Sequence, residues 1–115
     1  MEMKIKKSVA TLLAHIIKID KRDVEKEAPL FCKFLGADFG CDDAEAKDIL
    51  EKTIAQEYNL DEHIDIINDA LKDDKLSKMH ILEQLNHVIY SDKIESHDYE
   101  VFEKIKNRLF ADNEK

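Results

Sequence analysis

The chain has 115 residues, of which 43% are hydrophobic and 38% charged, and its formal net charge is −8. This length suits one domain with its own core, and two Gly and one Pro are too few for the turns of an all-β protein. The acidic balance disfavours nucleic acid as a partner, because phosphates would be repelled. No apolar run reaches the ~20 residues of a membrane span, so we expect a cytoplasmic protein without a transmembrane segment.

The first half of the chain predicts three helices. Apolar residues at helical spacing cover about residues 2–19. Asp23 can cap a second helix, which ends between Gly36 and Gly40 and in which Pro29 predicts a kink or a separate first turn. Asp42 and Glu45 form the pattern of a capping box that opens a third helix.

The second half continues the helical pattern. Asn59 or Asp61 starts a shorter helix, Ser77 caps the next one, and Ser96 or Asp98 opens the last, in which Tyr99 is expected to face inward. Residues 110–115 form a polar tail. The sequence therefore predicts an all-α fold: residues 1–115 form a single compact bundle of six or seven helices, with no linker that would divide domains.

One stretch occurs twice. Residues 13–21 (LAHIIKIDK) and 85–93 (LNHVIYSDK) are offset by 72 positions, and five of their nine positions are identical. In each copy the apolar end of a helix runs into an acidic turn, and a second helix follows. This repeat predicts two pseudo-symmetric helical hairpins that face each other across one core.

The repeated aspartates, Asp20 and Asp92, lie at helix C-termini, where the helix dipole disfavours a negative charge by ~0.3–1 kcal/mol. Each therefore needs a partner. One interpretation is that the turn acids cap the following helix or accept hydrogen bonds from the backbone of the turn. The other is a hard cation such as Ca²⁺ or Mg²⁺, which prefers several oxygen ligands. The candidate metal ligands are Asp20, Asp23 and Glu27 in the first turn and Asp92, Glu95 and Asp98 in the second.

Other chemistry has little support. His15 and His87 lie away from the centres of their apolar stripes, and His63, His80 and His97 provide no pair at ligand spacing, so a histidine-based metal site is not expected. No cofactor-binding motif, glycine-rich loop or nucleophile with an adjacent base is present, so no catalytic residue is predicted. Cys32 and Cys41 are isolated and predict neither a zinc site nor a redox pair.

The middle of the chain is strongly acidic. Residues 38–74 contain thirteen Asp and Glu against three Lys, a net charge of −10. Such a surface keeps a protein soluble and can also attract a cation or a basic protein partner.

The repeat resembles the TerB-like domains, which include the tellurite-resistance protein TerB and the N-terminal domain of certain membrane-anchored DnaJ-like co-chaperones. The resemblance rests on Leu12 to Asp20 with Glu25 and Glu27, and on Leu85 to Asp92 with Asp98 and Glu100. Family members typically read Ala-Asp-Gly at the turn, where this chain reads Ile19-Asp20-Lys21 and Ser91-Asp92-Lys93. The resemblance implies a bundle of about seven helices that serves stress responses without catalysis and whose acidic turns bind metal ions or proteins.

Two hypotheses follow. The first is a non-enzymatic helical module, a monomer or weak dimer, whose acidic turns and acidic surface bind a divalent cation or a basic protein partner. The alternative is a small metal-dependent enzyme or metal-storage protein that uses the paired acidic turns as its site.

Overall fold

The computed structural model describes residues 3–110, and this part of the chain contains only helices and their connections. A 3₁₀ turn, Met3–Ile5, leads into α1 (Lys6–Ile19), and five further helices follow in chain order. They are α2 (Val24–Phe39), α3 (Asp43–Ala55), α4 (Leu60–Ala70), α5 (Lys75–Tyr90) and α6 (Ser96–Leu109). The predicted all-α fold is confirmed.

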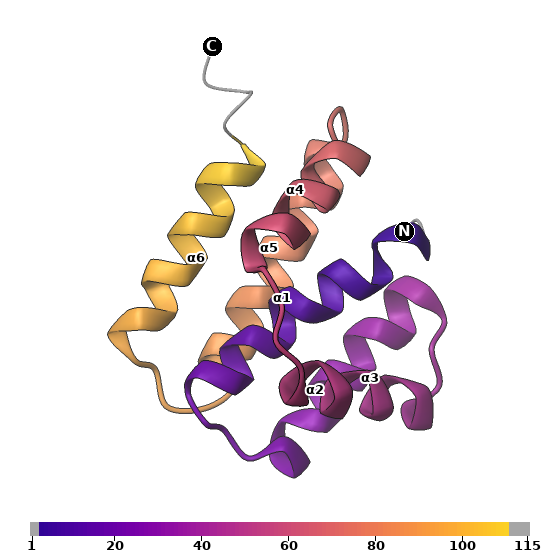
Figure 1. Cartoon of the computed structure of the whole chain (residues 1–115), viewed down its shortest axis with the longest axis vertical. Helices are drawn as coiled ribbons and strands as arrows, with labels where there is room; N and C mark the ends of the chain where they lie inside the picture. Colours follow the sequence, from indigo (N-terminus) through magenta and orange to yellow (C-terminus); the bar gives the residue numbers. More distant parts are fainter. Residues whose placement is uncertain (1–2, 111–115) are drawn as a thin grey trace.

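Helix α1 lies at the centre of the bundle, where it packs against α2, α3, α4 and α5 (Figure 1). Nine of its fourteen residues are buried, and these include the polar Ser8 and Thr11. A helix that is covered on most sides is typical of a core position rather than of a surface. Helix α6, at the edge of the bundle, packs against α4 and α5. The radius of gyration, 13.2 Å, matches the roughly 13 Å expected for one compact domain of this length.

Most helix starts lie where the sequence predicts them. Asp23, Asp42 and Asn59 each accept a backbone hydrogen bond from the first turn of α2, α3 and α4, respectively. The predicted N-cap of α5, Ser77, was wrong by three positions, because Asp74 is the N-cap. Ser77 lies in the first turn of the helix and donates hydrogen bonds to the Asp74 carboxylate from its backbone N–H and its hydroxyl. Glu95, rather than Ser96 or Asp98, is the N-cap of α6, and Asp98 closes the capping box from within the helix.

Two details of the helix interiors differ from expectation. Helix α2 runs through Pro29 as one element, so the first turn is not separate. Because Pro29 lies near the N-terminus of α2, its missing N–H removes one bond without ending the helix. Tyr99 does not face inward, since its side chain is 40% exposed on the outer side of α6. The polar tail beyond Phe110 lies outside the described residues.

The two hairpins of the repeat are α1–α2 and α5–α6, and their first helices pack against each other. Their turns thus come together at one end of the molecule. The two-fold relation between the hairpins stays a prediction. The turns themselves differ, because Lys21 has a φ of 51° and is the one non-glycine residue with positive φ in residues 3–110.

Lys21 occupies the position at which the resembled family carries Gly, and a left-handed conformation costs a non-glycine residue roughly 1–2 kcal/mol. We therefore expect Lys21→Gly to raise the free energy of unfolding by about 0.5–1 kcal/mol, since the relief of strain exceeds the extra entropy of the unfolded chain. Lys93→Gly, the matched change in the second turn, should lower it, because Lys93 has no positive φ. Urea denaturation measures both, and equal effects of the two changes would contradict the assignment of strain to Lys21.

Candidate functional site: the junction of the two acidic turns

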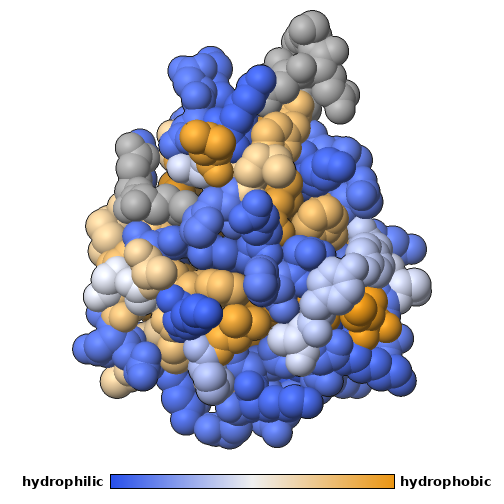
Figure 2. All heavy atoms as spheres, turned by 180° about the vertical axis from the view of Figure 1, so that it is seen from behind, coloured by the Kyte–Doolittle hydropathy of each residue, from blue (hydrophilic) through white to orange (hydrophobic). Residues whose placement is uncertain are grey.

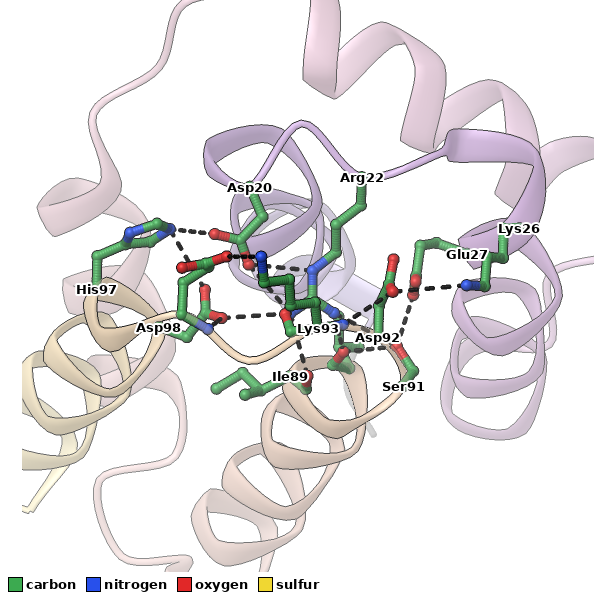
Figure 3. A network of polar contacts seen from close by, with 12 residues as sticks. Asp20, Arg22, Lys26, Glu27, Ile89, Ser91, Asp92, Lys93, His97 and Asp98 are labelled. Carbon is green, nitrogen blue, oxygen red and sulfur yellow. Dashed lines mark hydrogen bonds and ion pairs between the residues drawn. The ribbon is translucent and has the colours of Figure 1, made fainter.

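Arg22 joins the two turns. Its side chain is 2% exposed, and it extends from the end of the α1–α2 turn across to the end of α5 (Figure 3). The guanidinium donates to the backbone carbonyls of Val88, Ile89 and Lys93, the last two at 3.0 and 3.2 Å. These carbonyls include orphan acceptors at the C-terminal end of α5, where the helix dipole favours a positive charge. Arg22 therefore caps a helix that is 66 residues further along the chain.

The same guanidinium holds one aspartate from each hairpin. Arg22 Nε donates to Asp20 Oδ2 at 3.0 Å, and Nη2 donates to Asp98 Oδ2 at 3.3 Å. Asp98 Oδ2 also accepts the backbone N–H of Glu95 at 2.9 Å, which completes the capping box of α6. One buried cation and two buried carboxylates thus form an ion-paired group between the turns, as buried charges require.

The second oxygen of each aspartate faces His97. His97 Nε2 is hydrogen-bonded to Asp20 Oδ1 and lies 3.8 Å from Asp98 Oδ1. Asp98 is completely buried, and its Oδ1 has no hydrogen-bond partner within residues 3–110. Asp20, His97 and Asp98 each offer one ligand atom within 4.8 Å of the other two, and they are the one group of three or more such residues in the described part of the chain. In each aspartate, Oδ2 contacts Arg22 and Oδ1 faces His97.

The two carboxyl groups are not equivalent. Burial raises the pKa of Asp98, and the adjacent Asp20 raises it further. Burial also acts to raise the pKa of Asp20, but the hydrogen bond that Asp98 donates when protonated and the bonds to His97 and Arg22 outweigh it, so the pKa of Asp20 lies below its ordinary value. The hydrogen bond to Asp20 raises the pKa of His97. Of the two carboxyl groups, Asp98 is therefore the one that keeps its proton to the higher pH, and a proton and a metal ion would compete for its Oδ1.

The remaining predicted ligands do not join this group. Asp23 is exposed and accepts the backbone N–H of Glu25 as the N-cap of α2, and Glu95 is the N-cap of α6. Asp92 accepts its own neighbour's N–H, from Lys93 at 2.8 Å, and pairs with Lys26 at 3.5 Å.

Glu27 is buried and faces the opposite turn. Its Oε2 lies 2.7 Å from the hydroxyl of Ser91, whereas Oε1 has no partner among the described residues. The structure therefore does not assemble the three acids of either turn around one point. It brings one acid of each turn together, at Asp20 and Asp98.

The acidic middle of the chain is partly neutralised inside the molecule. On α4, Asp61 pairs with Lys104 at 2.8 Å and Asp65 pairs with Arg108 at 2.6 Å, which ties α4 to α6. On α3, Asp42, Asp43 and Glu51 are exposed. Fewer unpaired acids are therefore exposed on this surface than the thirteen Asp and Glu of residues 38–74 suggest.

Within the described residues, no helix is both long and apolar enough to cross a membrane. A surface cavity of about 520 Å³ is lined by residues 57–61 and Lys104, none of which belongs to the junction of the turns.

An all-α bundle whose two helical hairpins join at acidic turns defines a class of small helical modules. The chain belongs to the TerB family: the family model described as tellurite resistance protein TerB matches residues 6–107. No curated protein and no solved structure matches the chain significantly. The resemblance drawn from the repeated turns is thus confirmed over nearly the whole chain.

Proposed function

We propose that this TerB-family module is non-catalytic and binds one divalent cation at the junction of its turns, through Asp20 Oδ1, Asp98 Oδ1 and His97 Nε2. The observation that carries the proposal is Asp98 Oδ1, which is buried, accepts no hydrogen bond from the described residues and lies beside two other donor atoms. A buried carboxylate oxygen without a partner costs free energy, and a cation would remove that cost.

The donor set favours a particular class of ion. One imidazole with two carboxylates suits Zn²⁺, Mn²⁺ and other first-row transition ions better than Ca²⁺ or Mg²⁺, which prefer oxygen alone. Ligand atoms that surround such an ion at ~2.1 Å lie roughly 3–3.5 Å apart. Asp98 Oδ1 must therefore come closer to the other two atoms, and the hydrogen bond between His97 and Asp20 must give way to the ion. His97 is 44% exposed and can move, whereas Asp98 is fixed by Arg22 and the capping box.

The surroundings support binding rather than catalysis. Three surface cavities of about 380–520 Å³ are all lined by residues outside the junction, which favours binding of an ion over catalysis on a substrate. The description of the family supports a role in stress response, which we propose here as well. A basic protein partner is the second candidate, and it is favoured by the exposed acids Asp42, Asp43 and Glu51 on α3.

Calorimetric titration and thermal unfolding of the metal-stripped protein test the cation site. We expect Zn²⁺ or Mn²⁺ to bind with one site per chain and more tightly than Ca²⁺ or Mg²⁺. At 100-fold excess over the dissociation constant, the ion should stabilise the fold by ~2.7 kcal/mol, which is several degrees in Tm. Asp98→Asn and His97→Ala should each abolish the shift.

Asp23→Asn is the matched control, because it makes the same change in a turn acid outside the group, and Asn caps a helix as well as Asp does. It should leave ion binding unchanged. If no ion changes Tm, or if Asp23→Asn weakens binding as much as Asp98→Asn does, the proposed site is wrong and the group is a structural ion pair.

A further inference from the structure

Exposed apolar side chains gather on the α5–α6 hairpin. The large hydrophobic residues that are exposed within residues 3–110 number seven, and five of them lie on α5, on α6 or in the connection between them. These five are Leu76, Met79, Tyr90, Ile94 and Tyr99. Figure 2 shows apolar surface between the charged side chains on the side of the molecule opposite to that of Figure 1. An apolar face of this kind is typical of an interaction surface.

The spacing along α5 is that of a second helical seam. The outward positions are Leu76, Met79, Glu83, Asn86 and Tyr90, and they alternate by three and four residues. This is the a/d spacing of helices that pack side by side. The inward face of α5, with Ile81, Leu85 and Val88, is already buried in the core of the bundle. Helix α5 therefore has one seam that is packed in the core and one that borders α6 and carries the exposed Leu76, Met79 and Tyr90.

A groove lies between α5 and α6 along this seam. It encloses about 250 Å³ and is lined by Met79, Leu82, Glu83, Asn86, Phe102 and Lys106. At the end nearest the turn, the hydroxyl groups of Tyr90 and Tyr99 are hydrogen-bonded at 2.8 Å. At the other end, Leu76 is 84% exposed. The hairpin thus carries both an apolar groove and a projecting apolar side chain that a groove of this kind would accept.

The charges at the groove decide which partner fits. Glu83 on α5 and Lys106 on α6 are exposed on opposite walls, and neither has an ion-pair partner in the part of the chain that the structure describes. By contrast, the other basic residues of α6, Lys104 and Arg108, pair with aspartates of α4. A two-fold axis across the groove would place Glu83 of one copy opposite the partner's Lys106, and the reverse. A second copy therefore supplies both missing counter-charges.

From this arrangement we infer that the α5–α6 face is a homodimer interface, in which two hairpins pack about a two-fold axis as a four-helix contact. Leu76 and Met79 enter the partner's groove, and Glu83 pairs with the partner's Lys106. Asn86, a polar residue on the seam, favours a single register. Two chains that each carry −8 repel one another, so the dimer is a weak one that forms at micromolar or higher concentration.

Sedimentation equilibrium of the full chain, from about 5 to about 500 µM near physiological salt, tests the interface. We expect a reversible monomer–dimer equilibrium, which Met79→Glu weakens at least tenfold. Ile66→Glu is the matched control, because Ile66 is a comparably exposed apolar residue on α4, outside this face. It should leave the equilibrium unchanged. A chain that stays monomeric throughout, or a dimer that Ile66→Glu dissociates and Met79→Glu does not, overturns the inference.

Charge reversal distinguishes the two-fold arrangement from other uses of the face. Glu83→Lys and Lys106→Glu should each weaken the dimer, because each places like charges opposite one another. The double variant restores the opposite charges and should restore most of the affinity. If the double variant dimerises no better than the single ones, the proposed pairing is wrong. The four substituted residues are exposed, so circular dichroism should show that the variants keep the fold; they are Ile66, Met79, Glu83 and Lys106.

Discussion

Replacement of Arg22 by Met should lower the free energy of unfolding by about 3–5 kcal/mol, the range for breaking a buried ion pair by removing one partner. The loss combines several terms. Asp20 and Asp98 would remain as adjacent buried carboxylates without their shared cation, and the carbonyls of Ile89 and Lys93 would lose their donor. Methionine fills a similar volume, so the change measures lost polar contacts more than a cavity.

Two further variants separate charge from geometry. Arg22→Lys keeps the positive charge but has no planar fork, so it cannot reach both aspartates and the end of α5 together, and it should recover only part of the loss. Lys21→Met removes a neighbouring exposed charge and should change stability by less than about 0.5 kcal/mol. Urea denaturation with a common m-value provides the measurement. A loss below about 1 kcal/mol for Arg22→Met would contradict the view that Arg22 holds the two hairpins together.

The sequence predicted the helices well because their signals are local. Apolar spacing and the caps at Asp23, Asp42 and Asn59 act within one or two turns of the chain, and each lies where it was expected. The central position of α1 was not predicted, and the residues that it buries include the polar Ser8 and Thr11. Thr11 donates to the carbonyl of Lys7 four residues earlier. Such a bond satisfies a hydroxyl without water and is invisible to hydropathy patterns.

The candidate site was predicted only in part, for a related reason. The repeat drew attention to the two turns, and the candidate ligands there included Asp20 and Asp98, which the structure brings together. Arg22 was not selected because it lies outside the repeat: the equivalent position in the second copy is Ile94. His97 was set aside because it forms no pair at ligand spacing with another histidine. His97 meets an aspartate 77 residues away. A basic residue beside an acidic turn is the signal that could have revealed Arg22, since a buried group of acids requires a cation.

The turns also show why acids that are close in sequence do not form one set of ligands. Asp20 and Asp23 are three residues apart but have different contacts. Asp20 faces the opposite hairpin, whereas Asp23 is the N-cap of the helix that follows it. The pairing between hairpins follows from the packing of α1 against α5, which sets the two turns side by side. Sequence spacing reports only on neighbours within one hairpin. The candidate site forms only where the two hairpins pack against each other.

The double variant Arg22→Met/Asp98→Asn should be more stable than the sum of its single changes by at least about 1 kcal/mol. Asp98→Asn alone should cost about 1–2 kcal/mol, because the amide oxygen can still accept the N–H of Glu95 while the charge-assisted bond from Arg22 is lost. Once Arg22 is absent, however, the negative charge of Asp98 destabilises the folded state, because it is buried beside Asp20 without a cation. Neutral Asn then removes a repulsion that the wild-type protein does not have. Urea denaturation of the four proteins in this cycle gives the coupling energy. Simple additivity would mean that Arg22 acts through the carbonyls at the end of α5 alone and that the two aspartates do not depend on it.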